Sequence, residues 1–537
     1  MRRGLSPIAE RLIRSSQSVY ASCLGFLSVT TSQTGGWLAR ACLLWLIASA
    51  CVPVALAQSA SAQAGTSKQS SSPQKSGADA AAKSSQAKIS PKQGEELFRS
   101  VDEILKFASK DTSLPVKAEV KRQLVDRDIV TAFLQKHFAE DDDAQRLRRS
   151  ELVLKKFGLL PRDFDLQSFL VVLLREQVAG YYDPQTKMVN LLDWIDPEAQ
   201  KPVLAHELTH ALQDQSFGLE RFLKAGGDLG ASKLEPTLAD VENDEASAAH
   251  QAVVEGQAMV VLLDYELAPT GHSVVESPQI VDALKAWMVT GTADSVEFRS
   301  APLYIREALT FPYRYGLDFE VQLLTKAGKD PAFAGAFRNP PKTTREIMQP
   351  ETYLAGERIS PLPLPDLPRV FKAYDKFDVG AVGEFDVAIL IDQYAGVEVS
   401  KRLYPEWRGG YYYAARPKGD PNAPLALLYV SRWSDPEQAA EFASVYARGL
   451  DQRYLHVHDT SGDSSKSKGT DASGQSDDYQ IQTLTGKHSW LTEQGPIFIN
   501  VQGNMVLVTE SLDQTSSEEI QRELLPGAAA ATNSQQP

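Results

Sequence analysis

The segment His206-Glu207-Leu208-Thr209-His210 constrains the fold of this chain more than any other feature. It is an H-E-x-x-H pattern, in which two imidazoles stand four residues apart and a carboxylate follows the first. A helix turns about 100° per residue, so the two imidazoles and the carboxylate share one face. The pattern therefore predicts a helix whose histidines bind one metal ion, with Glu207 facing the open position of that ion.

The apolar residues of the same segment support a helix. Leu204, Leu208, Ala211 and Leu212 cluster on the side opposite the histidines, which gives the segment a core face. Polar residues opposite an apolar stripe also occur on any surface helix, which is the plain structural interpretation. The small number of histidines, 8 in 537 residues, argues against a chance occurrence of the pattern.

A catalytic zinc site normally has three protein ligands and keeps a fourth position for water, so a third ligand is needed. Glu255 is the candidate, within a helical pattern expected from Asp240 to Leu263. Its face is mostly small or apolar, where an unpaired carboxylate would be costly. Gly256 would let this helix approach the histidine-bearing helix closely.

Three other residues compete with Glu255 for the third position. His250 points to the opposite side of the same helix and is expected to face solvent. Glu242 and Glu245 are expected to be solvated charges near the start of that helix.

These elements resemble those of a known family. The run from Val203 to Ala211, with Asp214 following, resembles the active-site helix of thermolysin-like neutral proteases. Glu255-Gly256-Gln257-Ala258 resembles the E-G-x-A element of gluzincins, the zincins whose third zinc ligand is glutamate. The chain departs from thermolysin in its longer gap between His210 and Glu255, and in Met259, which stands where thermolysin has Asp.

The chain more closely resembles a group of exported bacterial gluzincin-like proteins that lack a well-defined substrate. The segments 179–184 and 311–316 are also similar to that group, and the resemblance covers about residues 95 to 350. It implies a zincin-like fold and a metallopeptidase that acts on peptide or protein substrates. Zn²⁺ would be held by His206, His210 and Glu255, and Glu207 would act as general base and then general acid.

The supporting roles have more than one candidate each. Asp214 either orients a ligand histidine or is an ordinary solvated charge. Tyr313 is the first candidate for a donor to the developing oxyanion, with Tyr304, Arg306 and Tyr315 as alternatives and simple packing as the plain interpretation.

The segment from Gly180 to Leu192 reads as a hairpin with a turn at Asp183-Pro184. In zincins a strand at this position forms the edge of the cleft. An extended peptide could add to such an edge by main-chain hydrogen bonds. The plain interpretation is a structural hairpin.

Residues 1–57 read as a signal peptide, with early arginines, an apolar run from Ala41 to Val54 and an A-x-A site at Ala55-Leu56-Ala57. The apolar run is too short for a comfortable membrane span, so the mature protein is expected in the periplasm or outside the cell. Lipid anchoring at Cys51 is the alternative. All three cysteines lie in this leader, so the mature chain would have no disulfide.

The charge balance argues against nucleic-acid binding. The leader carries five Arg and Glu10, a net +4, so its removal takes the formal charge from -14 to -18. A chain this acidic is a poor binder of phosphate backbones.

The expected fold class is α+β, with a zincin-like core of helices and a small sheet followed by a smaller α+β domain. The core of the second domain is predicted from a strand at Leu425–Val430, a helix at Pro436–Ala447 and a hairpin at 497–509. In chain order, the predicted segments are a disordered linker at 58–93, the metallopeptidase domain at 94–350, a Pro-rich linker at 351–369, the C-terminal domain at 370–525 with a disordered insert at 459–478, and a disordered tail at 526–537.

Two function classes follow. The leading one is an exported zinc metallopeptidase. The alternative is a non-catalytic cell-envelope or binding protein that retains a structural zinc site. Glu207 favours the enzyme, because a structural site has no need of a base.

Overall fold

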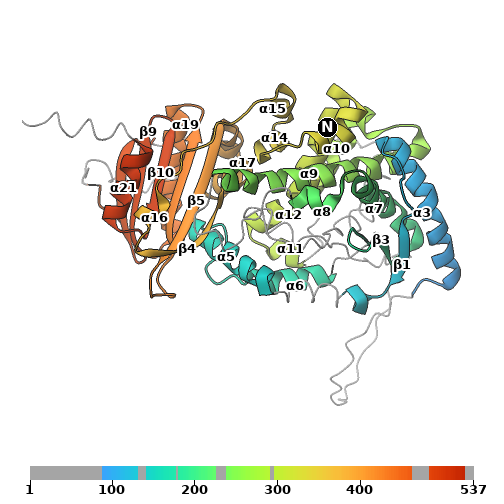
Figure 1. Cartoon of the computed structure of the whole chain (residues 1–537), viewed down its shortest axis with the longest axis horizontal. Helices are drawn as coiled ribbons and strands as arrows, with labels where there is room; N and C mark the ends of the chain where they lie inside the picture. The colour runs from blue at the N-terminus through green and yellow to red at the C-terminus, as the bar shows by residue number, and fades with distance from the viewer. Residues whose placement is uncertain are drawn as a thin grey trace, which may run out of the picture.

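The computed structural model of the protein describes residues 88–130, 141–176, 180–224, 238–290, 296–461 and 483–525. The predicted signal peptide 1–57, the tail 526–537, and most of the linker 58–93 and of the insert 459–478 lie outside these residues. The fold is α+β, with a helical region that contains a small sheet and a second region built on an antiparallel sheet (Figure 1). None of the described helices combines the length and apolar character needed to cross a bilayer.

The first described helix, α3 (Pro91–Thr112), begins three residues before Gly94, where globular sequence was expected to start. Ser90 explains this start, because its hydroxyl accepts the Gln93 N–H while the Gln93 side chain accepts the Ser90 N–H. The apolar face of α3, which contains Leu97, Val101, Ile104 and Leu105, is buried.

The small sheet contains the predicted hairpin. Its strands are β1 (Lys121–Val125), β2 (Tyr181–Asp183) and β3 (Met188–Leu192), in the order β1-β3-β2. β2 and β3 are antiparallel, and β1 joins β3 in parallel. The hairpin prediction is confirmed, and β2 lies at an edge of the sheet.

Three long helices form the centre of the helical region: α7 (Pro197–Phe217), α9 (Leu238–Leu267) and α12 (Leu303–Ala327). α9 packs on both of the others and also reaches β4 of the second region (Figure 1). It is longer than the predicted 240–263. Gly256 makes a close approach possible, but to α12 and not to α7, the helix that carries the two histidines. A Cβ added at Gly256 would lie 2.2 Å from the Gly316 carbonyl oxygen.

Gly316→Ala is expected to lower the free energy of unfolding by about 1–3 kcal/mol, because its Cβ would lie 2.2 Å from the Ala252 carbonyl oxygen and force the two helices apart. Gly94→Ala is the matched control, since it sits in α3 with no atom closer than 4.0 Å to the new Cβ. That variant should gain about 0.5–1 kcal/mol from helix propensity. Urea unfolding of both variants tests the pair, and equal stabilities would contradict the close approach.

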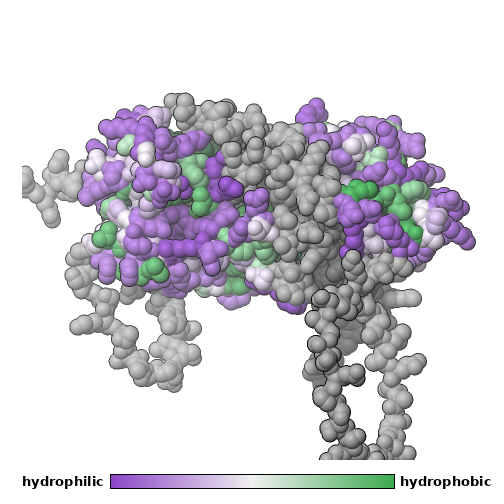
Figure 2. All heavy atoms as spheres, turned by 90° about the horizontal axis from the view of Figure 1, so that it is seen from below, coloured by the Kyte–Doolittle hydropathy of each residue, from purple (hydrophilic) through white to green (hydrophobic). Residues whose placement is uncertain are grey.

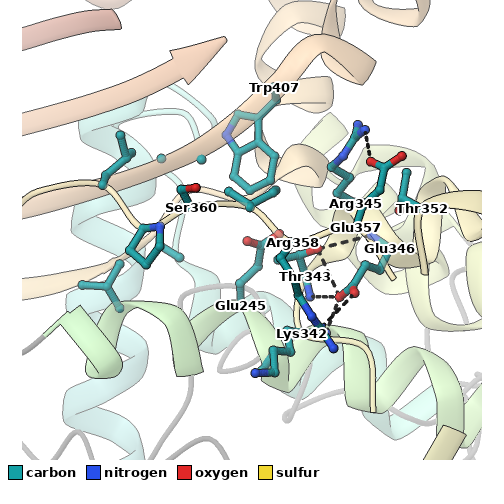
Figure 3. A pocket seen from close by; sticks show the side chains of 18 of the residues that line it. Glu245, Lys342, Thr343, Arg345, Glu346, Thr352, Glu357, Arg358, Ser360 and Trp407 are labelled. Carbon is teal, nitrogen blue, oxygen red and sulfur yellow. Dashed lines mark hydrogen bonds and ion pairs between the residues drawn. The ribbon is translucent and has the colours of Figure 1, made fainter. Parts of the chain in front are cut away.

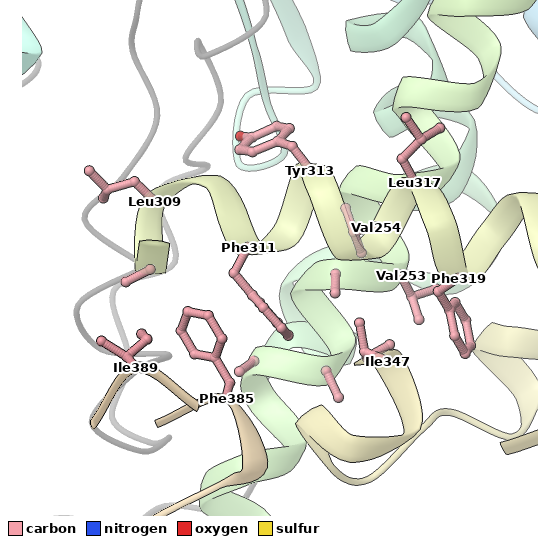
Figure 4. Close-up of a cluster of buried hydrophobic side chains, with 14 of the residues drawn as sticks. Val253, Val254, Leu309, Phe311, Tyr313, Leu317, Phe319, Ile347, Phe385 and Ile389 are labelled. Atoms are coloured by element: carbon pink, nitrogen blue, oxygen red, sulfur yellow. The ribbon is translucent and has the colours of Figure 1, made fainter. Parts of the chain in front are cut away.

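A continuous hydrophobic cluster joins the two regions. Figure 4 shows Phe311 of α12 beside Phe385, on helix α17 (Glu384–Ala395). The rings of Phe311 and Phe385 lie 4.3 Å apart. This core is formed across the Pro-rich segment, so the sheet region is packed against α9 and α12.

The second region is built on a seven-stranded antiparallel sheet in the order β4-β5-β6-β10-β9-β8-β7. Its strands are β4 (Tyr374–Ala381), β5 (Trp407–Pro417), β6 (Ala426–Trp433), β7 (Val457–Asp459), β8 (Gly486–Thr492), β9 (Gly495–Gln502) and β10 (Met505–Glu510). The predicted strand at 425–430, the helix at 436–447 (α19, Pro436–Arg448) and the hairpin at 497–509 are all present. His456 and His458 are exposed.

The remaining helices surround these elements. They are α5 (Asp141–Phe157), α6 (Leu166–Glu176), α8 (Leu219–Lys224), α10 (Pro278–Thr290), α11 (Val296–Ser300), η4 (Asp330–Gly335), α13 (Ala336–Arg338), α14 (Thr344–Met348), α15 (Pro350–Ala355), α16 (Leu367–Val370), α18 (Val397–Leu403), α20 (Leu450–Arg453) and α21 (Gln514–Leu524), with single turns at Ala268–Thr270, Val274–Glu276 and Tyr404–Glu406. On the face in Figure 2, hydrophilic residues cover most of the described surface, and hydrophobic residues form small patches.

Candidate metal centre

The helix that carries the H-E-x-x-H pattern has well-defined ends. Asp196 accepts the N–H groups of Glu198 and Ala199, and Pro197 occupies the first helical position. The helix ends at Gly218, whose positive φ of 72° suits glycine. Residues 202–214 are buried all round, because α3 and α9 pack on this helix. The histidines therefore lie inside the protein.

The structure brings His206, His210 and Glu255 together. The two Nε2 atoms lie 3.1 Å apart, and Glu255 Oε2 lies 3.2 Å from His206 Nε2 and 3.5 Å from His210 Nε2. Donor atoms about 2.0–2.2 Å from one tetrahedral ion would be roughly 3.3 Å apart, so these three atoms have the spacing of a ligand set. All three residues are buried, and they form a group that could hold a metal ion.

The electrostatics of the three residues suit a cation. Burial lowers the pKa of His206, which favours the neutral imidazole that metals bind. Burial would raise the pKa of Glu255, but the two imidazoles outweigh it and lower that pKa below its ordinary value. The carboxylate is therefore held in the charged form that a metal ion requires.

A chain of amides fixes the tautomer of His210. Gln257 donates its Nε2 to two backbone carbonyls at η4, and these carbonyls can only accept. Its Oε1 must then accept from Gln213 Nε2, at 2.9 Å. Gln213 Oε1 in turn faces His210 Nδ1 at 2.9 Å. His210 thus carries its proton on Nδ1, and the lone pair of its Nε2 is left for the metal.

If the group of His206, His210 and Glu255 holds a metal ion, Gln213→Leu is expected to weaken its binding by about 10- to 100-fold, because His210 loses the acceptor that fixes its tautomer. Gln200→Leu is the control on the same helix. Gln200 is also buried and hydrogen-bonded, but its partners are Leu192 and Ile195. Zinc affinity and thermal stability should be measured for both variants. The interpretation fails if both lose stability equally and neither loses affinity.

Glu207 lies beside the ligand group and is held by the hairpin. Its Oε2 accepts the Tyr182 N–H at 3.0 Å. Its Oε1 is buried and has no hydrogen-bond partner among the described residues. Burial raises the pKa of this carboxyl well above its usual value, and the Tyr182 N–H opposes part of that rise. One oxygen is therefore oriented while the other remains available to a proton.

Asp214 has neither of the two roles expected for it. It is buried, and its Oδ2 accepts the Tyr182 hydroxyl and the Lys187 ammonium, each at 2.6 Å. Its Oδ1 accepts the Leu219 N–H at 3.1 Å. Asp214 thus ties α7 to the hairpin and to α8. The residue beside His210 is Gln213, which the sequence analysis did not single out.

Two of the competing ligands lie away from the metal group, and both differ from expectation. His250 does not face solvent but is buried, with Nδ1 3.1 Å from the Phe222 carbonyl oxygen and its ring stacked on Phe222. Burial lowers its pKa to about 4. The other competitor, Glu245, is not a solvated charge either. It is buried and accepts the Thr344 N–H at 2.8 Å, and burial raises its pKa to about 7. The side chain of Glu242 lies outside what the structure describes.

Glu245 lines a cavity of about 390 Å³ between α9, α14 and β5 (Figure 3). Most charged groups there are paired with one another. Glu346 accepts from the start of α14 and faces Arg358 at 3.6 Å, while Arg345 pairs with Glu357 at 3.4 Å. None of the three metal-binding candidates lines this cavity.

The four oxyanion-donor candidates all lie on α12, and one of them is close to the ligands. The Tyr313 ring lies 6.4 Å from the His206 ring in a stacked arrangement. The Tyr304 hydroxyl faces Asp386 at 3.4 Å, the Arg306 guanidinium faces the Arg299 carbonyl, and the Tyr315 ring packs under Arg314.

Comparison with models of known protein families, with curated proteins and with solved structures gives no match for this chain. The site is therefore interpreted from its own geometry.

Proposed function

We propose that this chain is an exported zinc-dependent peptidase of the gluzincin type, which hydrolyses peptide bonds. The observation that carries the proposal is the convergence of two imidazole nitrogens and one carboxylate oxygen in a buried space. Lone pairs that converge away from water repel one another unless a proton or a cation lies between them.

The donor set favours zinc. Two imidazoles and a carboxylate are the ligands of a familiar class of catalytic zinc sites, which leave a fourth position open. When bound there, the ion would supply a Lewis acid that polarises a carbonyl and acidifies a water molecule. His206, His210 and Glu255 would hold it.

Glu207 is the proposed general base and acid. Its free Oε1 would accept a proton from the attacking water and return it to the leaving amine. The Tyr182 N–H holds the other oxygen, so the carboxylate is oriented before substrate arrives. Tyr313 is the proposed donor to the oxyanion, on the strength of its position beside His206.

The substrate is proposed to be an extended peptide that lies along β2. β2 is at an edge of its sheet, and Tyr182 on this strand bonds directly to Glu207. An extended peptide beside this edge would therefore lie next to the general base. Main-chain pairing to a strand edge gives affinity with little sequence preference.

Zinc content and hydrolysis of an unstructured protein, measured with chelator and after zinc is restored, test the proposal. We expect one zinc per chain, activity that chelation removes, and recovery on adding zinc back. Tightly bound zinc with no hydrolysis of any unstructured substrate would favour the non-catalytic binding protein instead.

A further inference from the structure

A small cavity lined by several basic side chains lies where α5 meets the sheet region. It has a volume of about 170 Å³. Its cationic lining residues are Lys155 and Lys156 of α5, Arg162, Arg416 of β5 and Arg453 of α20. No Asp or Glu belongs to its described lining. The chain as a whole has a net charge of -14, so a lining with basic but no acidic residues differs from the average composition of the chain.

The carboxylates that balance these cations stand outside the lining. The pairs are Lys155–Glu151, Lys156–Glu510, Arg162–Glu493 and Arg453–Glu510, at 2.5, 3.8, 2.9 and 2.8 Å. These pairs hold the cationic side chains in fixed positions. No carboxylate belongs to the described lining, although Lys156 also donates to Gln494 Oε1 at 3.0 Å and to Ser511 Oγ at 2.8 Å.

Two guanidinium groups at this cavity have an unused donor. The Nε atoms of Arg416 and Arg453 are buried, and neither has a hydrogen-bond partner among the residues described. The Arg453 side chain is only 4% exposed. Arg416 is held over the Phe377 ring at 5.0 Å and bonds to the Pro421 carbonyl. A buried donor without an acceptor is costly, so each of these guanidinium groups keeps one donor that the described residues do not satisfy.

We propose that this cavity binds a compact oxyanion of the phosphate class, either free or as the phosphate group of a larger molecule. Guanidinium groups match the tetrahedral oxygens of phosphate, and lysines add charge. A cavity of about 170 Å³ is large enough for a phosphate group. The site is separate from the proposed peptidase function, since its lining includes none of the metal-centre residues.

Binding there would link three parts of the fold. The two lysines and Arg162 come from α5 and the segment that follows it in the helical region, and Arg416 and Arg453 come from β5 and α20 in the sheet region. A ligand that bridges them stabilises the folded chain by mass action. We therefore expect phosphate to raise the melting temperature of the full chain.

Titration calorimetry of the full chain with inorganic phosphate, pyrophosphate and glycerol phosphate, at constant chloride, tests the proposal. Arg416→Gln should raise the Kd at least about tenfold, because a charge-assisted bond is lost. Lys418→Gln is the matched control. It removes the same charge two residues away, but Lys418 is exposed and does not line the cavity. Its Kd should change less than about twofold.

Lys155→Gln is the second variant, on a different element, and should also weaken binding if Arg416→Gln fails to fold. Glycerol phosphate that binds as tightly as phosphate would indicate a phosphate group on a larger molecule, and weaker binding would indicate the free anion. The proposal is overturned if none of the three probes binds saturably. Equal losses in Lys418→Gln and in the cavity variants would also overturn it.

Discussion

Glu207→Gln is expected to lower peptide hydrolysis by about 10² or more while zinc content stays at one per chain, because an amide cannot accept the proton of the attacking water. The substitution keeps the size and shape of the side chain. Its amide oxygen can still accept the Tyr182 N–H, so the hairpin should stay in place. Initial rates and zinc content of the same preparation are the measurements.

Glu198→Gln is the control for this experiment. Glu198 lies in the first turn of the same helix, its side chain is 77% exposed, and it pairs with Lys201 at the surface. A surface pair of this kind contributes little, so the control should keep both zinc and activity. Wild-type turnover in Glu207→Gln would remove Glu207 from the role of base.

The metal group was predictable because its chemistry is encoded locally. The spacing of His206 and His210 sets their direction on one helix, whatever surrounds them. Glu255 could also be predicted from the sequence, since a carboxylate on an otherwise small and apolar helical face needs a partner. The structure places all three together within the buried interior.

The residues around that group were harder to assign, and the reason is burial. The sequence predicts that His250 and Glu245 face solvent, because polar residues opposite an apolar stripe are normally exposed. For Asp214 it predicts either exposure or a contact that orients a ligand histidine. α7 and α9 have neighbours on several sides, so their polar residues are buried with specific partners. The periodicity of one helix shows which of its faces is apolar, but it does not show which other elements pack on its remaining faces.

The role of Gln213 was not predicted, because it also depends on tertiary contacts. Its distance of three residues from His210 makes contact possible on a helix. Its role depends on Gln257 and on η4, which lie far along the chain and meet it only in the tertiary structure. Gly256 was predicted to let α9 approach the histidine-bearing helix closely. The close approach exists, but it is to α12, which no local pattern identifies.

Long-range pairing likewise limited the second region. The strands near 425–430 and 497–509 carry clear alternation and turn signals, and the structure contains them. The order of the seven strands was not predictable, because each pairing depends on residues distant in sequence. The contact of Phe385 with Phe311 was not predictable either, because the two residues lie on opposite sides of the Pro-rich segment in the sequence.

Loss of a ligand should have a larger effect on zinc than loss of Gln213. His206→Ala, His210→Ala and Glu255→Gln each leave two of three protein ligands, so the zinc affinity should fall by more than the ~10- to 100-fold expected when only a supporting residue is removed. Activity should be lost with the metal. Chelation of the wild-type chain should also lower its melting temperature, since an ion that binds only the folded state stabilises it.

Glu245→Gln separates this prediction from a general effect of removing a buried carboxylate from α9. Glu245 lies ten residues before Glu255 on the same helix and is also buried, but its partner is Thr344. We expect this variant to keep full zinc occupancy while its stability changes, because the lost contacts lie at α14 and not at the metal. Zinc per chain and melting temperature should be measured together for both variants. If Glu255→Gln kept its zinc and Glu245→Gln lost it, the third ligand would be Glu245, and the convergence of Glu255 on the two histidines would need another explanation.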